Sequence, residues 1–187
     1  MDPRIGNRRR ILRSPLGIVL ALAVIAAIAV LAALLQPPMI PLVGRAEAVD
    51  GDTFRLGDAR VRLTGLDAPE LDQTCADAAG AFWPCGRQAR GFAARLLDGH
   101  PVTCRPEGRD RYRRVLSRCF VSGGGLGASI VGAGSAVAGI DYALVEAGAR
   151  AARRGIWAGA FESPANWRRD RGQEPSGLWA WIRAWFQ

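Results

Sequence analysis

Apolar and polar residues alternate along two stretches in the middle of the chain. From Thr53 to Leu63 the alternation is broken once, by Gly57-Asp58. A two-residue turn with glycine between two alternating segments is typical of a β-hairpin that buries one face. Two further alternating segments, 102–104 and 116–119, flank a very polar run and predict a second hairpin.

Apolar residues at helical spacing predict three helices, at residues 89–97, 128–133 and 142–154. Gly99 and Gly155 are expected to end the first and the third, because glycine accepts the left-handed conformation that follows many helices. In the third helix we expect the pair Glu146–Arg150 to face solvent, and the residues expected to face the core are Val145, Ala149 and Ala152. Five short strands with about three helices predict an α+β fold, a five-stranded Greek-key barrel of the oligonucleotide-binding (OB) type.

A different pattern occupies the N-terminal part, where residues 16–35 form a run of uncharged, apolar residues. As a helix this run is about 30 Å long, the thickness of a bilayer's hydrocarbon core. A cleaved signal peptide is the alternative, but its apolar region usually has about 7–15 residues and ends at a small-x-small site. We favour an uncleaved transmembrane helix that contacts the lipid bilayer through residues 16–35.

Arginines precede the apolar run, whereas the next charge after it is Arg45. The positive-inside rule then places the N-terminus in the cytoplasm and the remainder in the periplasm or outside the cell. The C-terminal segment, rich in tryptophan, either contacts the membrane surface or docks on the domain. The expected segments are a cytoplasmic tail (1–14), a transmembrane anchor (15–36), a proline-rich spacer (37–44), the OB domain (45–171) and an amphipathic C-terminal segment (172–187).

The chain carries a net charge of +8, and all 25 of its basic residues are arginine. Genomic base composition explains this usage more simply than selection for phosphate binding. Arginine nevertheless suits phosphate, because its planar fork donates paired hydrogen bonds. The composition therefore permits a polyanionic partner without requiring one.

Four cysteines in an exported domain suggest two disulfides. Cys104 and Cys119 would face each other across the second hairpin, and Cys75 and Cys85 would close the loop before the first helix. Four unpaired thiols in the core are the alternative. A zinc site is disfavoured, because the spacings are not CxxC and His100 is the only histidine.

Three polar segments stand at ends of the predicted strands: 50–53 (DGDT), 62–70 (RLTGLDAPE) and 110–114 (DRYRR). Asp52, Asp67 and Glu70 offer hard carboxylate oxygens of the kind that Ca²⁺ prefers. Hydrolysis of a phosphodiester needs charge neutralised on the phosphate, a water activated in line, and donors aimed at the transition state. An acid beside a metal ion and two arginines would meet these needs.

Taken together, these segments closely resemble the thermonuclease (staphylococcal nuclease-like) family, whose pattern runs DGDT, R-x-x-x-x-D-x-P-E and D-x-Y-G-R. The match extends from Ala46 to Trp167, and it departs at Arg113, which stands where the family has glycine. The resemblance implies that Asp52 and Asp67 bind Ca²⁺ with the main-chain carbonyl of Ala68. It also implies that Glu70 lies at the metal and acts as the general base.

The same resemblance implies that Arg62 and Arg114 hold the scissile phosphate and that Arg114 also favours the leaving oxygen. The residues expected to contact the nucleotide are Tyr112 and Arg111, and those expected to support the metal ligands are Asp50 and Thr53.

The sequence therefore favours a calcium-dependent endonuclease that acts on DNA and/or RNA outside the cytoplasm, with no obligate protein partner. The alternative is a barrel with weak or lost catalysis that binds nucleic acid or protein at the cell envelope. Glu70, Arg62 and Arg114 together favour the enzyme, because a binding role does not need the acid.

Overall fold

The computed structural model describes residues 15–34 and 40–172, in two units that divide between residues 38 and 39. The first unit is helix α2 (Pro15–Leu34), an uncharged run that covers most of the predicted anchor. Within the described part of the chain, no helix is both long and apolar enough to cross a membrane. The predicted tail 1–14, residues 35 and 36 of the anchor, and residues 173–187 of the C-terminal segment lie outside the described residues.

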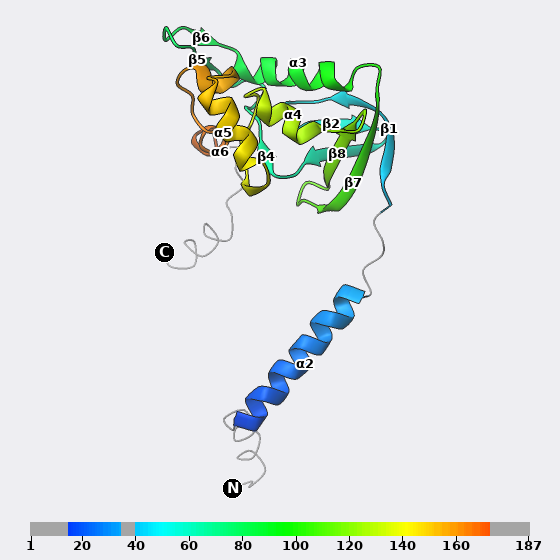
Figure 1. Cartoon of the computed structure of the whole chain (residues 1–187). Coiled ribbons are helices and arrows are strands. Elements are labelled where there is room, and N and C mark those ends of the chain that lie inside the picture. The colour runs from blue at the N-terminus through cyan, green and yellow to red at the C-terminus, as the bar shows by residue number, and fades with distance from the viewer. Residues whose placement is uncertain (1–14, 35–39, 173–187) are drawn as a thin grey trace. The chain divides into compact units, whose positions relative to one another are not determined.

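The second unit is built on a closed five-stranded barrel (Figure 1). Antiparallel pairs run in the order β3-β2-β1-β7-β8, and a parallel pairing of β3 with β8 closes the barrel. The predicted OB-type barrel is therefore confirmed. Its strands are β1 (Leu42–Ala48), β2 (Thr53–Leu56), β3 (Ala59–Leu63), β7 (Pro101–Arg109) and β8 (Val115–Val121). Residues 42–44, assigned to the spacer from sequence, are thus the start of β1.

Both predicted hairpins form. In the first, Phe54 pairs with Val61 across β2 and β3, and both side chains are buried as the alternation requires. The second is longer than predicted, because β7 and β8 continue into the polar run. Cys104 pairs with Cys119 in register and forms a disulfide, and Cys75 and Cys85 form another, so both predicted disulfides are present.

Helices cover one side of the barrel and complete its core (Figure 1). The amphipathic helix α3 (Cys85–Leu97) packs against β1, and α4 (Leu126–Gly132) packs against β8. Each fully buried aliphatic side chain stabilises the fold by roughly 1.5–3 kcal/mol. The core residues that these helices contribute include Ala93, Leu97, Leu126 and Ile130.

The third predicted helix is shorter than expected and differently oriented. It consists of a 3₁₀ turn, η1 (Ile140–Tyr142), followed by α5 (Ala143–Ala151). Ala149 is buried as predicted, but Val145 is 36% exposed and Ala152 is exposed. Glu146 is buried instead, because its carboxylate accepts a hydrogen bond from the N–H of Ala138 while it pairs with Arg150 at 2.6 Å. The need to satisfy a backbone donor overrides the amphipathic pattern here.

Short elements join these parts. Strands β4 (Leu66–Asp67) and β10 (Val137–Ala138) pair with each other, as do β5 (Cys75–Ala76) and β6 (Phe82–Trp83), while β9 (Gly124–Gly125) extends the main sheet. A 3₁₀ turn, η2 (Gly155–Ala158), leads towards α6 (Pro164–Asp170), a helix that the sequence analysis did not predict. Its start is marked by Ser163, whose hydroxyl accepts from the N–H of Asn166, and by proline in the first turn.

Candidate functional site

The first acidic pair lies in the turn between β1 and β2. The Asp50 carboxylate accepts hydrogen bonds from the N–H groups of Asp52 (2.9 Å) and Thr53 (2.6 Å). Aspartate favours turns of this kind, in which its side chain bonds to the backbone two residues on. Gly51 leaves no room for a side chain, because a Cβ there would lie 2.6 Å from the Cβ of Ala68. This close approach brings the turn against the segment that carries Asp67.

Asp52 is an acid inside the protein, with 3% of its surface exposed. Its carboxylate accepts from the hydroxyl of Thr53 (2.9 Å) and from the N–H of Ala68 (3.3 Å). Burial raises the pKa of Asp52 to about 7, and the neighbouring Arg62 guanidinium opposes that rise. The ionised form of Asp52 therefore depends on a nearby positive charge.

Arg62 supplies that charge from β3, where it lies opposite Thr53 in the strand register. Its Nη1 and Nη2 lie 3.0 and 2.8 Å from the two oxygens of Asp52, and Nη2 also lies 2.7 Å from Asp67. Burial lowers the pKa of Arg62, but the two carboxylates outweigh that effect and raise it above its ordinary value. Arg62 thus joins two acids that come from different strand ends.

Asp67 and Glu70 are joined by a second arginine, Arg168, which belongs to α6. Its Nη1 lies 3.1 Å from Asp67 and 2.8 Å from Glu70, and its Nη2 lies 2.9 Å from the other oxygen of Asp67. The side chains of all three residues are between 22% and 28% exposed, so the bridge lies at the edge of the protein interior. Sequence reasoning did not identify Arg168.

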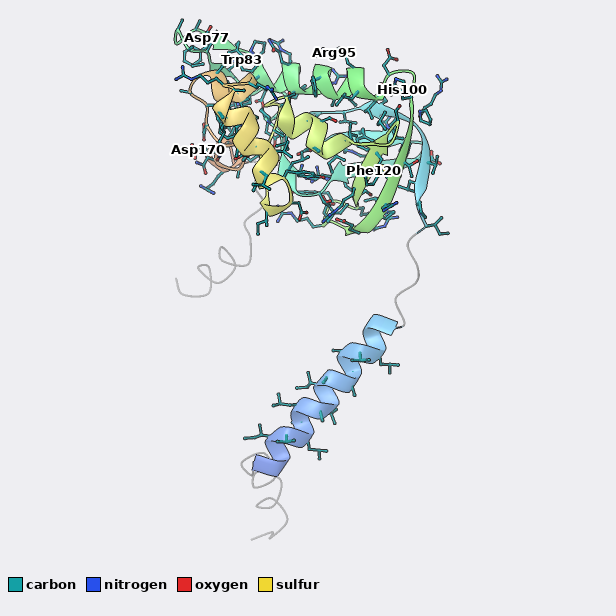
Figure 2. All side chains as sticks on the ribbon, in the orientation of Figure 1. Asp77, Trp83, Arg95, His100, Phe120 and Asp170 are labelled. Atoms are coloured by element: carbon teal, nitrogen blue, oxygen red, sulfur yellow. A yellow bond between two sulfur atoms is a disulfide. The ribbon has the colours of Figure 1, made fainter. Side chains whose placement is uncertain are left out.

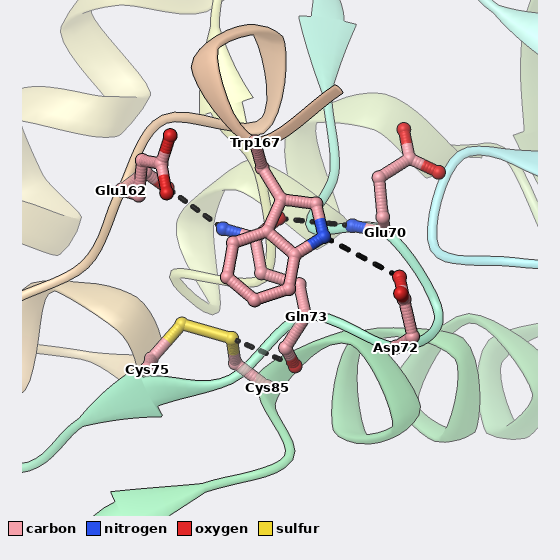
Figure 3. Close-up of a disulfide and its surroundings, with 7 residues drawn as sticks. All are labelled: Glu70, Asp72, Gln73, Cys75, Cys85, Glu162 and Trp167. Atoms are coloured by element: carbon pink, nitrogen blue, oxygen red, sulfur yellow. Dashed lines mark hydrogen bonds between the residues drawn. A yellow bond between two sulfur atoms is a disulfide. The ribbon is translucent and has the colours of Figure 1, made fainter. Parts of the chain in front are cut away.

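The backbone of Glu70 is fixed by the loop that follows it. Gln73 is fully buried, and its side-chain oxygen accepts from the N–H of Glu70 at 3.1 Å. Its side-chain amide donates to the carbonyl of Glu162 at 2.7 Å, which ties the loop to the segment before α6. A Cβ at Gly86 would lie 1.6 Å from the carbonyl oxygen of Glu70, so only glycine fits where α3 meets this loop. Figure 3 shows the hydrogen bonds of Gln73 with Glu70 and Glu162 beside the Cys75–Cys85 disulfide.

Arg114 approaches the same place from the turn between β7 and β8. Its Nε lies 2.7 Å from Asp110, and its Nη1 lies 3.4 Å from the hydroxyl of Thr53. Partial burial raises the pKa of Asp110, but hydrogen bonds and charge from Arg114 outweigh it and lower the pKa. Arg113 adopts a φ of 64°, the left-handed conformation that the family's glycine would adopt without strain. Arg113 thus takes up this conformation in spite of its side chain, and Arg114 reaches Thr53.

The predicted residues meet around one open cavity of about 540 Å³. Asp67 and Thr53 contact this set through hydrogen bonds. The only histidine of the sequence, His100, lies between α3 and β7 (Figure 2) and is not among the lining residues. Predicted site residues that line the cavity are Asp50, Asp52, Arg62, Ala68, Glu70, Arg111, Tyr112 and Arg114, and arginines not predicted there are Arg60 and Arg168.

The types of side chain in this cavity suit a hard divalent cation, but their arrangement does not present them to one. Among the residues that the structure describes, no three His, Cys, Asp or Glu side chains are arranged so as to hold a metal ion. Guanidinium groups lie against these carboxylates instead: Arg62 binds Asp52 and Asp67, and Arg168 binds Asp67 and Glu70. The predicted calcium ligands are brought together, and the calcium site itself stays a prediction.

A comparison with protein families gives one match, to the model described as staphylococcal nuclease homologue, over residues 60–159. The chain belongs to the staphylococcal nuclease homologue family. The matched segment contains both arginines expected to bind phosphate and the acids Asp67 and Glu70. Asp52 precedes it and Arg168 follows it, so the cavity of this staphylococcal nuclease homologue is also lined by residues outside the matched segment.

Three similar proteins are found, and the names of two of them agree with this family. The succinoglycan biosynthesis protein ExoI of Rhizobium meliloti (strain 1021) is 42% identical over 101 residues, which are 51% of this chain and 53% of that protein. Two probable staphylococcal-like nucleases of Oryza sativa subsp. japonica, CAN3 and CAN2, are each 29% identical over 119 residues, 60% of this chain. Those residues are 29% of CAN3 and 30% of CAN2. This staphylococcal nuclease homologue thus spans about half the length of the first relative and less than a third of the other two.

Proposed function

We propose that the chain is a calcium-dependent endonuclease that hydrolyses phosphodiester bonds of DNA and/or RNA. The observation that carries the proposal is that two acids and two arginines from separate parts of the barrel domain line one cavity, with a third acid, Asp67, bonded to Arg62 beside them. Family membership and the two nuclease relatives support the same reaction class.

Arg62 and Arg114 are the groups proposed to hold the scissile phosphate. Each is oriented by acids, Arg62 by Asp52 and Asp67 and Arg114 by Asp110, so little side-chain freedom remains to be lost when substrate binds. A guanidinium has five N–H donors, so donors remain for phosphate oxygens after these contacts are made. Donors fixed before the reaction stabilise the extra charge of the transition state at little reorganisation cost.

Glu70 is the proposed general base. It lines the cavity that Arg62 and Arg114 also line, and the hydrogen bond to Gln73 fixes its backbone. A carboxylate in this position can take a proton from a water molecule that lies between it and the phosphate. The proton would remain on Glu70 until the product leaves.

Calcium is the proposed cation because Asp52, Asp67 and Glu70 are hard oxygen donors and no soft ligand lines the cavity within the described chain. When bound, the ion would neutralise charge on the phosphate. The buried carboxylate of Asp52, whose pKa is raised by burial, is a group that an added positive charge would stabilise in its ionised form.

The decisive experiment measures cleavage of single-stranded DNA, double-stranded DNA and RNA by the full-length chain in non-ionic detergent. Hydrolysis should require Ca²⁺ and stop when a chelator is added. Glu70→Gln should lower kcat by roughly 10²–10⁴-fold with little change in KM, because it removes proton transfer and keeps the shape. Glu47→Gln, at an exposed position on β1, is the matched control.

Binding of nucleic acid without hydrolysis at any calcium concentration would favour the second candidate, a binding module at the cell envelope. An equal loss in kcat and affinity on changing Glu70 would remove its role as the base.

We also propose, from the sequence alone, that residues 16–35 anchor the chain in the inner or plasma membrane with the barrel domain outside the cytoplasm. The arginines before residue 14 and the two disulfides support this orientation. A protease added outside spheroplasts should digest the domain. Protection of the domain there, with digestion only after lysis, would reverse the topology.

A further inference from the structure

The Arg168 side chain bridges Asp67 and Glu70, two of the three acids proposed to hold the cation. Its two terminal nitrogens lie within 3.1 Å of three carboxylate oxygens, two from Asp67 and one from Glu70. Calcium binds oxygen ligands at about 2.3–2.6 Å, so an ion held by these same oxygens would compete with the guanidinium for them.

Helix α6 holds Arg168 there through contacts with the loop after Glu70. The indole N–H of Trp167 donates to Asp72 at 3.3 Å, and Arg171 pairs with the same carboxylate at 2.9 Å. The Arg171 guanidinium also lies 3.5 Å from the centre of the Trp167 ring, a cation–π contact. With the Gln73 amide bonded to the carbonyl of Glu162, these contacts fix α6 to the loop (Figure 3).

Arg62 and Arg168 differ in how easily each could leave its acids. Arg62 projects from the barrel sheet and neutralises Asp52, which is 3% exposed. If Arg62 left, the buried charge of Asp52 would have lost this partner. Arg168 binds acids whose side chains are 25% and 28% exposed, and it lines the open cavity. Breaking the contacts of Arg168 with these acids therefore costs less than breaking those of Arg62 with Asp52.

From these contacts we propose that Arg168 is a built-in counter-cation of the acid cluster, which Ca²⁺ must displace from Asp67 and Glu70 before it binds. The proposal rests on the proposed function, because it concerns the cation of that site. Arg168 lowers the apparent affinity for the ion, and it keeps Asp67 and Glu70 from repelling each other while the ion is absent. Because Arg168 belongs to α6, this helix raises the calcium concentration at which the site fills.

The test measures calcium binding to the full-length chain by titration calorimetry, in detergent and without any substrate. Arg168→Gln should bind Ca²⁺ at least tenfold more tightly than the wild type. Arg168→Lys, which keeps a positive charge but loses the fork, should lie between the two. Arg169→Gln is the matched control, because Arg169 is an exposed neighbour on α6 that bonds to Asn166 at 3.1 Å.

A second measurement uses the unmodified chain, so it decides the matter even if Arg168→Gln does not fold. Nitrogen-15 resonances of the Arg168 guanidinium should show slow rotation and slow proton exchange without calcium, and both should become fast as calcium is added.

Unchanged or weaker calcium binding by Arg168→Gln, in a wild type that binds calcium and cleaves DNA, would overturn this inference and leave the proposed function standing. Arg168 resonances that do not respond to saturating calcium would overturn it as well. Calcium binding by Arg168→Gln alone would support the inference. Absence of calcium binding by both chains would instead refute the proposed calcium dependence, and the inference with it.

Discussion

The site has two halves that are built in different ways. The barrel half consists of Asp52, Thr53 and Arg62, which lie within ten residues of one another on a single hairpin. The loop half consists of Glu70, Gln73 and Arg168, whose central contact joins residues 98 apart in sequence. The barrel half is held by strand pairing, whereas the loop half is held by side chains that reach across from another segment.

This difference matches two tasks proposed for the site. The barrel half is proposed to hold the phosphate, and the loop half is proposed to supply the base and to exchange its cation. Strand pairing in a closed barrel gives a rigid support, which suits an arginine that must meet a phosphate in a fixed position. In the loop half the ion pairs of Arg168 with Asp67 and Glu70 are partly exposed, so these pairs can rearrange at lower cost. Three changes test whether the halves are independent in this way.

Arg62→Gln should have the largest effect, because it removes the partner of a buried acid in the barrel half. The free energy of unfolding should fall by about 3–5 kcal/mol when measured well above the pKa of Asp52. Cleavage of DNA should fall by about 10²–10³-fold with the loss of a proposed transition-state donor. Denaturant unfolding and initial rates measure the two effects.

Arg55→Gln is the matched control on the same hairpin, because Arg55 is exposed on β2, and it should change the unfolding free energy by less than about 0.5 kcal/mol. If Arg62→Gln unfolds at the same denaturant concentration as the wild type, Asp52 does not depend on its arginine.

The two disulfides allow the halves to be loosened separately. Each closes a short stretch, with separations of 10 and 15 residues, and removing either should cost roughly 3 kcal/mol of stability. Replacing Cys104 and Cys119 by serine should leave kcat nearly unchanged, because β7 and β8 remain paired. Replacing Cys75 and Cys85 should lower kcat as well, because the N–H of Gly86 bonds to the carbonyl of Gln73 beside this bridge. Equal losses of activity in the two variants would show that the halves are not independent.

Arg113→Gly should have the smallest effect of the three changes. It tests the backbone of the turn that carries Arg114 and leaves the loop half untouched. The left-handed φ of Arg113 strains a residue with a Cβ, so glycine should raise the unfolding free energy by less than about 1 kcal/mol, after its larger entropy in the unfolded chain is deducted. DNA cleavage should stay the same. Arg111→Gly in the same turn, at a position without positive φ, should lower stability instead. A loss of stability in Arg113→Gly would mean that the turn carries no such strain.

The barrel half could be predicted from sequence because its information is local. The alternation around Gly57-Asp58 gave the hairpin residue for residue, and that hairpin places Arg62 opposite Thr53. The disulfide Cys104–Cys119 followed from the second hairpin for the same reason. Motif resemblance added the order of the acids, which periodicity alone does not supply.

The loop half could not be predicted in the same way. Nothing in the spacing of residues 163–170 indicates that α6 returns to Glu70, since that depends on Gln73, Asp72 and Trp167 meeting in three dimensions. The Ser163-Pro164 pair did signal a helix start, and a helix beginning there could have been proposed. Glu146 was misplaced for a related reason, because its partner, the N–H of Ala138, becomes a neighbour only in the fold.

The position of Arg168 so late in the chain has a consequence for the order of assembly. Synthesis runs from the N-terminus, so all five barrel strands, the last ending at Val121, leave the ribosome before α6 does. At about 5–20 residues per second, Arg168 follows Glu70 after several seconds, and until then Asp67 has Arg62 as a partner but Glu70 lacks Arg168. During synthesis the Glu70 carboxylate is therefore open to any cation of the compartment in which the chain emerges, until α6 forms.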